Sequence, residues 1–256
     1  MKKPLILITN DDGINAPGIL YLSKIARDYG EIAVIAPDKP QSGSGHAITI
    51  HTTLRIQPSF IHQAKTEYSI NGTPVDCVKL AVNKILPQKP DLILSGINHG
   101  SNSSINVIYS GTMSAAIEGY LEGIPSVGFS LCNYSIEADF SPSEKYIRQI
   151  IEWMLDKNKN ELICLNVNIP DLPAEHIRGI KICRQAKGNW VEEFEERLDP
   201  YNRPYYWMTG KFTNFEPSAQ DTDEWALANG YVSVVPVQTD LTCYKSIDKM
   251  KKDFAE

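Results

Sequence analysis

A strand, a helix and a second strand follow one another at the start of the chain, and this order constrains the fold more than any other feature. The apolar run Leu5–Thr9 ends at Asn-Asp-Asp-Gly, which is typical of a buried strand that stops at a turn. Residues 17–26 carry apolar side chains at helical spacing, with a proline at the start and a glycine beyond the end. A second apolar run, Glu31–Ala36, completes a βαβ unit, so the two strands are predicted to lie parallel.

The same alternation continues to about residue 170. Further strands are predicted at 47–56, 67–71, 91–95, 126–131 and 162–167, further helices at 75–86, 112–122 and 143–155, and a long loop at 96–111. This pattern favours an α/β fold in which residues 1–170 form a Rossmann-like, doubly wound and mostly parallel sheet.

The alternation breaks in the last third of the chain. Residues 171–256 are predicted to form a smaller, β-rich extension with hairpin-like arms and a terminal helix, used for oligomerisation. Strands are expected at 178–183, 205–208 and 231–237, and a helix at 241–254. Residues 189–204 are rich in Glu, Arg and aromatic side chains and show no clear period.

Composition excludes several classes of protein. Hydrophobic residues make up 42% and charged residues 22% of the chain, which is ordinary for a globular protein and excludes a disordered one. The formal net charge of −6 argues against binding to a nucleic-acid polymer, because such binding requires a basic face. A single nucleotide in a cleft remains compatible, since backbone N–H groups or a metal can neutralise its phosphate.

The cysteines and the longest uncharged stretch indicate where in the cell the protein is expected. The five cysteines are odd in number and include no C-x-x-C pair, so we expect buried, reduced thiols in a cytoplasmic protein. Residues 92–117 carry no charge but include eleven Ser, Thr, Asn or His residues, which is too polar for a membrane helix. No association with a membrane is therefore expected.

Oxygen-bearing side chains follow three of the predicted strands. Asp11 and Asp12 follow the first, Ser42 lies in a Gly/Ser-rich loop after the second, and Asn98 follows strand 91–95. Ligands of an open parallel sheet bind outside the carboxyl ends of its strands. Adjacent carboxylates favour a positive partner, and divalent cations such as Mg²⁺ and Mn²⁺ prefer oxygen ligands of these kinds. Alternatively, Asp-Asp-Gly is only a turn with a helix cap.

A second candidate site precedes the helix 112–122. Ser110, Gly111 and Thr112 combine hydroxyl groups with a glycine and the free N–H groups of a helix N-terminus, a combination that favours an anion. We predict that these three residues bind phosphate. The alternative is that Ser110 or Thr112 only caps the helix.

Two histidines lie in the same loops. His46 and His99 are both candidates for a general acid or base near neutral pH, and the sequence leaves open whether either is catalytic. Neither a G-x-x-x-x-G-K-[ST] phosphate loop nor a G-x-S-x-G nucleophile elbow is present.

Several motifs together resemble those of the SurE (survival protein E) family of 5′-nucleotidases. The most specific are Thr9–Gly13 with Ala16–Gly18, Ala36–Asp38 with Ser42 and Gly43, Ser95–Gly100, and Tyr109–Thr112 with Ala115–Gly119. Further matches are Gly72–Val78, Asn166–Pro170, and Thr222-Asp223 followed by Gly230–Ser233 and Pro236. The resemblance covers nearly the whole chain.

This resemblance implies a metal-dependent phosphatase that hydrolyses nucleoside 5′-monophosphates to nucleoside and phosphate, with 3′-monophosphates and other phosphoesters as further candidate substrates. It implies one Mg²⁺ or Mn²⁺ per subunit, held by Asp11, Asp12, Ser42 and Asn98, and a homodimer or homotetramer. Asp11 would act through an activated water or as the nucleophile, and Asn98 would orient metal and substrate together. The group that protonates the leaving oxygen is not assigned.

The chain departs from the family pattern at one place. Many family members carry a glycine and acidic residues where this chain has Ser103–Asn106, which leaves the preferred substrate open.

An alternative function is a non-catalytic, Mg²⁺-binding module, either nucleotide-responsive or receiver-like. A receiver needs a phospho-accepting Asp at the end of a central strand, and strand 91–95 ends in Ser-Gly-Ile-Asn instead.

Overall fold

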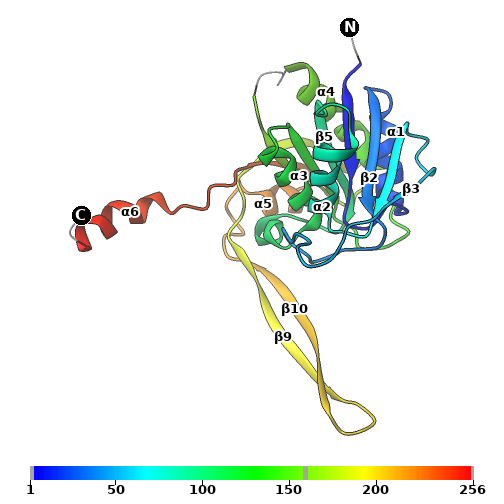
Figure 1. Ribbon diagram of the computed structural model, residues 1–256. Coiled ribbons are helices and arrows are strands. Elements are labelled where there is room, and N and C mark those ends of the chain that lie inside the picture. The colour runs from blue at the N-terminus through cyan, green and yellow to red at the C-terminus, as the bar shows by residue number, and fades with distance from the viewer. Residues whose placement is uncertain (1–2, 158–160, 255–256) are drawn as a thin grey trace.

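The apolar runs of the sequence become the strands of one twisted sheet with helices on both faces. The computed structural model describes residues 3–157 and 161–254 (Figure 1). The strands are β1 (Leu5–Thr9), β2 (Glu31–Pro37), β3 (Ile56–Pro58), β4 (Thr66–Ile70), β5 (Leu92–His99), β6 (Ser126–Leu131), β7 (Cys164–Ile169), β8 (Gly179–Ile182), β9 (Gly188–Leu198), β10 (Pro204–Asn214) and β11 (Tyr231–Val237). The α-helices are α1 (Pro17–Ala26), α2 (Pro74–Leu80), α3 (Gly111–Leu121), α4 (Glu144–Glu152), α5 (Asp223–Ala228) and α6 (Tyr244–Asp253). The short helices are η1 (Ala81–Ile85), η2 (Ser104–Ile108), η3 (Ser141–Ser143), η4 (Trp153–Lys157) and η5 (Ala174–His176).

The strand order reverses beside the first strand. The large sheet runs β3-β4-β2-β1-β5-β6-β7-β11-β8. β1 pairs in parallel with β2 on one side and β5 on the other, and β6 and β7 continue the parallel run. The chain therefore builds outward from β1 and later returns to its other side. This reversal opens a crevice at the carboxyl ends of β1 and β5, and the predicted doubly wound, mostly parallel sheet is confirmed.

Alternate residues of β1 face opposite helix layers. Ile6 and Ile8 pack in one core with α1 and α4, whereas Leu5 and Leu7 pack in a second core with α2 and α3. Successive side chains of a strand point to opposite faces, so a strand covered on both faces is apolar throughout. β1 is buried at each of its five residues.

The predicted strand over residues 47–56 is wrong. Only Ile56–Pro58 forms a strand there, and the preceding backbone bonds to the start of α2 instead. The Ala47 carbonyl oxygen accepts from Thr73 Oγ1 at 2.7 Å, and the Thr49 N–H donates to Asp76 at 3.0 Å. Hydrogen bonds between this backbone and nearby side chains take the place of hydrogen bonds to a neighbouring strand.

Two boundaries also differ from the predictions. Strand β5 runs on to His99, through a register shift between Ser95 and Asn98, where a loop was predicted from residue 96. The region without a clear period, 189–204, contains most of β9, and β10 is longer than the predicted 205–208. These two strands form an antiparallel hairpin that projects from the body (Figure 1). A projecting hairpin has no single buried face, so it lacks the apolar alternation that marks a strand.

The residues after 170 contribute to the sheet as well as projecting from it. β11 pairs antiparallel with β7, and β8 pairs parallel with β11 at the edge of the sheet. α6 stands away from the body at the end of an extended segment, and none of its residues is buried (Figure 1). None of the helices in residues 3–157 and 161–254 is long and apolar enough to cross a membrane.

The cysteines are unpaired. Cys77, Cys164 and Cys183 are buried as predicted, and Cys132 is half-buried. The prediction of burial is wrong for Cys243, which is exposed on the segment that leads to α6.

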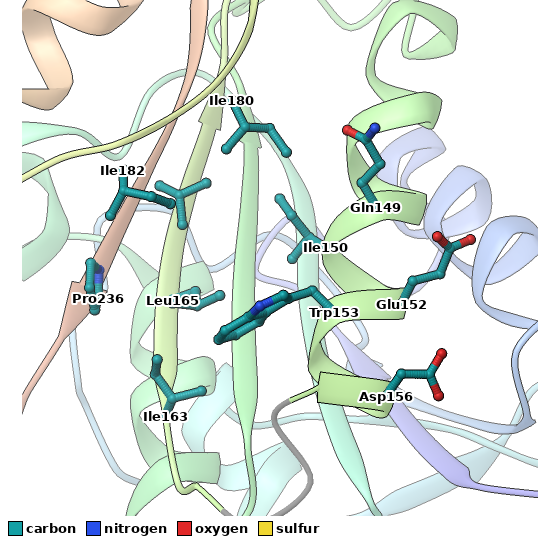
Figure 2. Close-up of a pocket in the computed structure, with 11 residues that line it drawn as sticks. Gln149, Ile150, Glu152, Trp153, Asp156, Ile163, Leu165, Ile180, Ile182 and Pro236 are labelled. Carbon is teal, nitrogen blue, oxygen red and sulfur yellow. The ribbon is translucent and has the colours of Figure 1, made fainter.

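An apolar pocket lies beside α4 and η4, against β7, β8 and β11. Figure 2 shows Trp153 lying across it between Ile163 and Ile150, with Ile180 and Ile182 on the opposite wall. Its volume is about 650 Å³. Ile163 precedes β7, so this pocket lies toward the amino ends of the parallel strands, away from the crevice at the switch point.

Candidate active site

A cleft of about 510 Å³ opens at the switch point between β1 and β5. Its walls come from the loops after β1, β2 and β6, from the start of α1 and from the last residue of β5. The residues that line it are Asp12, Gly13, Asn15, Ala16, Pro17, Asp38, Lys39, Pro40, Ser42, His99, Tyr134 and Ile136. Asp12 and Ser42, two of the predicted metal ligands, therefore face the same space.

The two adjacent carboxylates have different surroundings. Asp11 is buried, and its Oδ1 accepts a hydrogen bond from Thr112 Oγ1 at 2.5 Å. Burial raises the pKa of Asp11 to about 6, and the charge of Asp12 adds to this rise. Asp12 lines the cleft, and burial raises its pKa as well, although His99 acts in the opposite direction. The surroundings of the pair thus disfavour ionisation of both carboxyl groups.

The surroundings of this pair fit a divalent cation. Within the described part of the chain, neither Asp11 nor Asp12 forms an ion pair with Lys or Arg. Carboxylate, hydroxyl and amide oxygens are hard ligands that Mg²⁺ and Mn²⁺ accept. Across residues 3–157 and 161–254, no three His, Cys, Asp or Glu side chains gather as a metal cluster. An ion at this site therefore requires Ser or Asn oxygens, or water, to complete its ligands.

Ser42 and Asn98, the other two predicted ligands, carry such oxygens and follow or end the strands on either side of β1. The loop that carries Ser42 is tied to the site by two backbone hydrogen bonds, from Gln41 N–H to the Asp11 carbonyl oxygen at 2.7 Å and from Gly45 N–H to the Tyr109 carbonyl oxygen at 3.2 Å. Asn98 Nδ2 donates to the Gly100 carbonyl oxygen at 2.8 Å. Its Oδ1 is then the atom available to a metal.

The residues predicted to bind phosphate stand at the start of α3. Ser110 Oγ accepts from the Met113 N–H at 3.0 Å, so this hydroxyl caps the helix, as the alternative interpretation expected. Gly111 lies against Asp11: a Cβ at Gly111 would be 2.7 Å from the Asp11 Cβ. Thr112 bonds to Asp11, and phosphate binding by Ser110, Gly111 and Thr112 stays a prediction.

The two candidate histidines differ in their contacts. His46 Nε2 bonds to Glu118 Oε2 at 2.9 Å, and Lys79 Nζ lies 2.5 Å from Glu118 Oε1. These partners outweigh the effect of burial and lower the pKa of Glu118. His99 lines the cleft, packs edge-on against Phe140 at 5.1 Å, and has no hydrogen-bond partner on either ring nitrogen among the described residues. His99 is the histidine in the cleft, and His46 braces the Ser42 loop.

Sequence reasoning missed the polar network beneath the loop after β5. Asn168 Oδ1 accepts from the Asn102 N–H at 2.7 Å, and Asn166 Nδ2 donates to the Asn102 carbonyl oxygen at 2.8 Å. Asp223 at the start of α5 accepts from the Ser104 N–H at 2.8 Å. The signal was available, because Asn166 and Asn168 interrupt an otherwise apolar strand on the same face.

The comparisons with known proteins decide the family. The family model described as "Survival protein SurE" matches residues 6–192. The chain belongs to the SurE family. A 5′-nucleotidase SurE from Flavobacterium psychrophilum is 57% identical over 251 residues, which cover 98% of this chain and 97% of that protein.

More distant SurE proteins match over similar lengths. A 5′-nucleotidase SurE from Cytophaga hutchinsonii is 54% identical over 255 residues, covering 99% of this chain and 98% of that protein. The crystal structure of the SurE protein from Aquifex aeolicus superposes with a TM-score of 0.84 at 40% identity, covering 98% of this chain and all of that one. The likeness to SurE proteins therefore includes the C-terminal third as well as the sheet.

Proposed function

We propose that this chain hydrolyses nucleoside 5′-monophosphates to nucleoside and phosphate with the help of one divalent metal ion, Mg²⁺ or Mn²⁺, per subunit. One observation carries the proposal. Two adjacent carboxylates, neither of which pairs with a Lys or Arg of the described residues, stand at the switch point of the sheet, and the second opens into a cleft of about 510 Å³. A cleft of this size suits a small molecule, for which about 300–1,000 Å³ is usual.

The family supports the reaction class. The chain is an enzyme of the nucleotidase type, as a member of the SurE family whose relatives at 44–57% identity carry the name 5′-nucleotidase SurE. Dependence on metal, action on 3′-monophosphates and the range of other phosphoesters belong to the proposal.

Different residues of the chain would bind the metal and the substrate. Asp11, Asp12, Ser42 and Asn98 would hold the metal, which when bound supplies positive charge against the phosphate and lowers the pKa of a coordinated water. The N–H groups at the start of α3, from Gly111 and Thr112, would bind phosphoryl oxygens. The Thr112 hydroxyl and the close approach of Gly111 hold Asp11 against the N-terminus of this helix.

The proposal extends to assembly and location. We expect a homodimer or homotetramer, because the hairpin β9–β10 and α6 present exposed apolar side chains outside the sheet, among them Phe194, Trp207, Tyr244 and Met250. Contiguous exposed apolar surface is typical of an interface. A cytoplasmic location is expected from the unpaired cysteines.

The test is release of phosphate from a panel of nucleoside 5′- and 3′-monophosphates. Protein stripped of metal is compared with protein given Mg²⁺ or Mn²⁺ and with the variants Asp12→Asn and Asp28→Asn. Asp28 is an exposed carboxylate paired with Arg148, so its variant is a matched control. We expect metal-dependent turnover in wild type and control, and a loss of at least about 100-fold in Asp12→Asn, the scale of a lost electrostatic contact to the transition state.

The same assay separates the rival function. A regulatory module would bind nucleotide and Mg²⁺ without releasing phosphate under any metal. That result would contradict hydrolysis while leaving the site as a nucleotide-binding pocket.

A further inference from the structure

Two exposed apolar side chains form part of the wall of the active-site cleft. Tyr134 and Ile136 lie in the loop after β6 and are each 73% exposed. Both line the same cleft as Asp12 and Ser42. Large apolar side chains that are left open to solvent inside a functional cleft are typical of a surface that a ligand covers.

Contacts with the end of β5 hold Tyr134 in place. A Cβ at Gly100 would lie 2.2 Å from Tyr134 Cε1, so the tyrosine ring rests directly on the Gly100 backbone, which has a φ of +101°. The Gly100 N–H donates to the Leu131 carbonyl oxygen at 2.8 Å, which ties the two strand ends together. A ring held in this way offers a fixed, flat face.

The loop that carries the ring is braced on its other side. Asn133 Nδ2 donates to Asp171 Oδ2 at 3.0 Å, and Asn133 Oδ1 accepts from the Ser135 N–H at 2.8 Å. The Tyr134 phenol is neutral at physiological pH, because its ordinary pKa is near 10 and partial desolvation raises that pKa further. A neutral aromatic face in a fixed position favours stacking with another flat aromatic group.

We infer that Tyr134 and Ile136 form the nucleobase subsite of this cleft, so that the base stacks on the tyrosine ring while the phosphate lies at the carboxylate pair. This inference rests on the proposed function and deepens it. Stacking on an aromatic side chain tolerates every base, because each base has a π-face. The subsite therefore accepts purine and pyrimidine nucleotides alike and favours them over phosphoesters that lack a base.

A second aromatic pocket competes for this assignment. Tyr109, Trp190 and Met208 line a hollow of about 500 Å³ at the base of the β9–β10 hairpin. Trp190 is already engaged, because its Nε1 donates to Asn106 Oδ1 at 2.7 Å and its ring packs edge-on against Phe212. None of the four proposed metal ligands lines this hollow, whereas Asp12 and Ser42 line the cleft with Tyr134.

The test compares substrates with and without a base in variants of the intact chain. Steady-state hydrolysis of AMP, CMP and ribose 5-phosphate is measured for wild type, Tyr134→Ala, Tyr134→Phe and Trp190→Ala with saturating Mn²⁺. We expect Tyr134→Ala to lower kcat/KM for both nucleotides by about 5- to 100-fold, mainly through KM, since a lost stacking contact costs that much. Ribose 5-phosphate should change less than about twofold, and Tyr134→Phe should restore the nucleotides.

Two outcomes overturn the inference. An equal loss for ribose 5-phosphate and the nucleotides would mean that Tyr134 only supports the β5 end. A selective loss of nucleotide hydrolysis in Trp190→Ala, with Tyr134→Ala unchanged, would place the base against the hairpin. Failure of the proposed function looks different, because wild type would then release phosphate from none of the three substrates. Calorimetric binding of AMP and ribose 5-phosphate to the same variants would then test the subsite.

Discussion

The buried carboxylate of Asp11 makes the metal-free protein less stable than it would be without that charge. In the folded state its pKa is raised from 3.8 to about 6 by burial. A group whose folded pKa lies above its unfolded pKa stabilises the fold fully only below the unfolded value, and that stability is lost as pH rises through the folded value. The substitution Asp11→Asn removes the ionisation, so it should stabilise the metal-free protein at neutral pH.

The expected size follows from the two pKa values. The difference between about 6 and 3.8 corresponds to about 3 kcal/mol in the free energy of unfolding at pH 7.5, at about 1.36 kcal/mol for each unit. At pH 4.5 the wild-type carboxyl is mostly protonated in the folded state, and the same relation leaves about 1 kcal/mol. The change of about 2 kcal/mol between the two pH values is the diagnostic quantity, because any effect of the substitution that does not depend on pH cancels in it.

Urea unfolding of the metal-stripped proteins at pH 7.5 and 4.5 measures this quantity. Asp28→Asn is the control, since Asp28 is an exposed carboxylate in a surface ion pair. Adding Mn²⁺ at pH 7.5 should stabilise wild type by about 3 kcal/mol at 100 times its Kd, and Asp11→Asn by much less. The reasoning is refuted if Asp11→Asn destabilises the metal-free protein at pH 7.5, or if its effect is the same at both pH values.

Three further changes test other parts of the site. Gly111→Ala should lower kcat by at least about tenfold and also destabilise the fold, because the new Cβ would lie 2.7 Å from the Cβ of buried Asp11, so the backbone must shift; steady-state kinetics and urea unfolding check this. Glu118→Gln weakens the bonds that residue 118 forms with Lys79 and with His46, and His46 braces the Ser42 loop. The affinity for Mn²⁺, measured by calorimetry, should therefore fall by about tenfold. An unchanged Kd would contradict this role of His46. Deleting α6 should give a smaller assembly in sedimentation, while the chain still folds, because no residue of α6 is buried against the body.

The parallel core was predictable because its signals are local and strong. Runs such as Leu5–Ile8 are apolar throughout, since helices cover both faces of the sheet, and proline and glycine mark the limits of α1. The proposed metal ligands follow from the same logic, because the parallel order places the strand ends side by side. The burial of Asp11 and its contact with α3 did not follow, because they depend on the packing of a distant helix.

The errors have a common physical origin. Residues 47–55 alternate like a strand, but their partners are the capping groups of α2, which sequence pattern alone does not show. The β9–β10 hairpin has too little burial to impose a period, so its long strands look irregular in sequence. Tyr134 and Ile136 went unnoticed because an apolar side chain in a loop has no special signal until the cleft is seen.

The unequal burial of the two carboxylates is a consequence of strand geometry. Leu5 and Leu7 of β1 face α2 and α3, whereas Ile6 and Ile8 face α1 and α4. If this period of two continues past the end of β1, Asp11 turns toward α3 and Asp12 toward the side of α1. The contacts agree, because Asp11 bonds to Thr112 of α3 and Asp12 shares the cleft with Pro17 of α1. The Asp-Asp pair directly after β1 therefore has one fixed, buried carboxylate and one half-buried carboxylate at the cleft, an unequal pair that suits a metal site between helix and cleft.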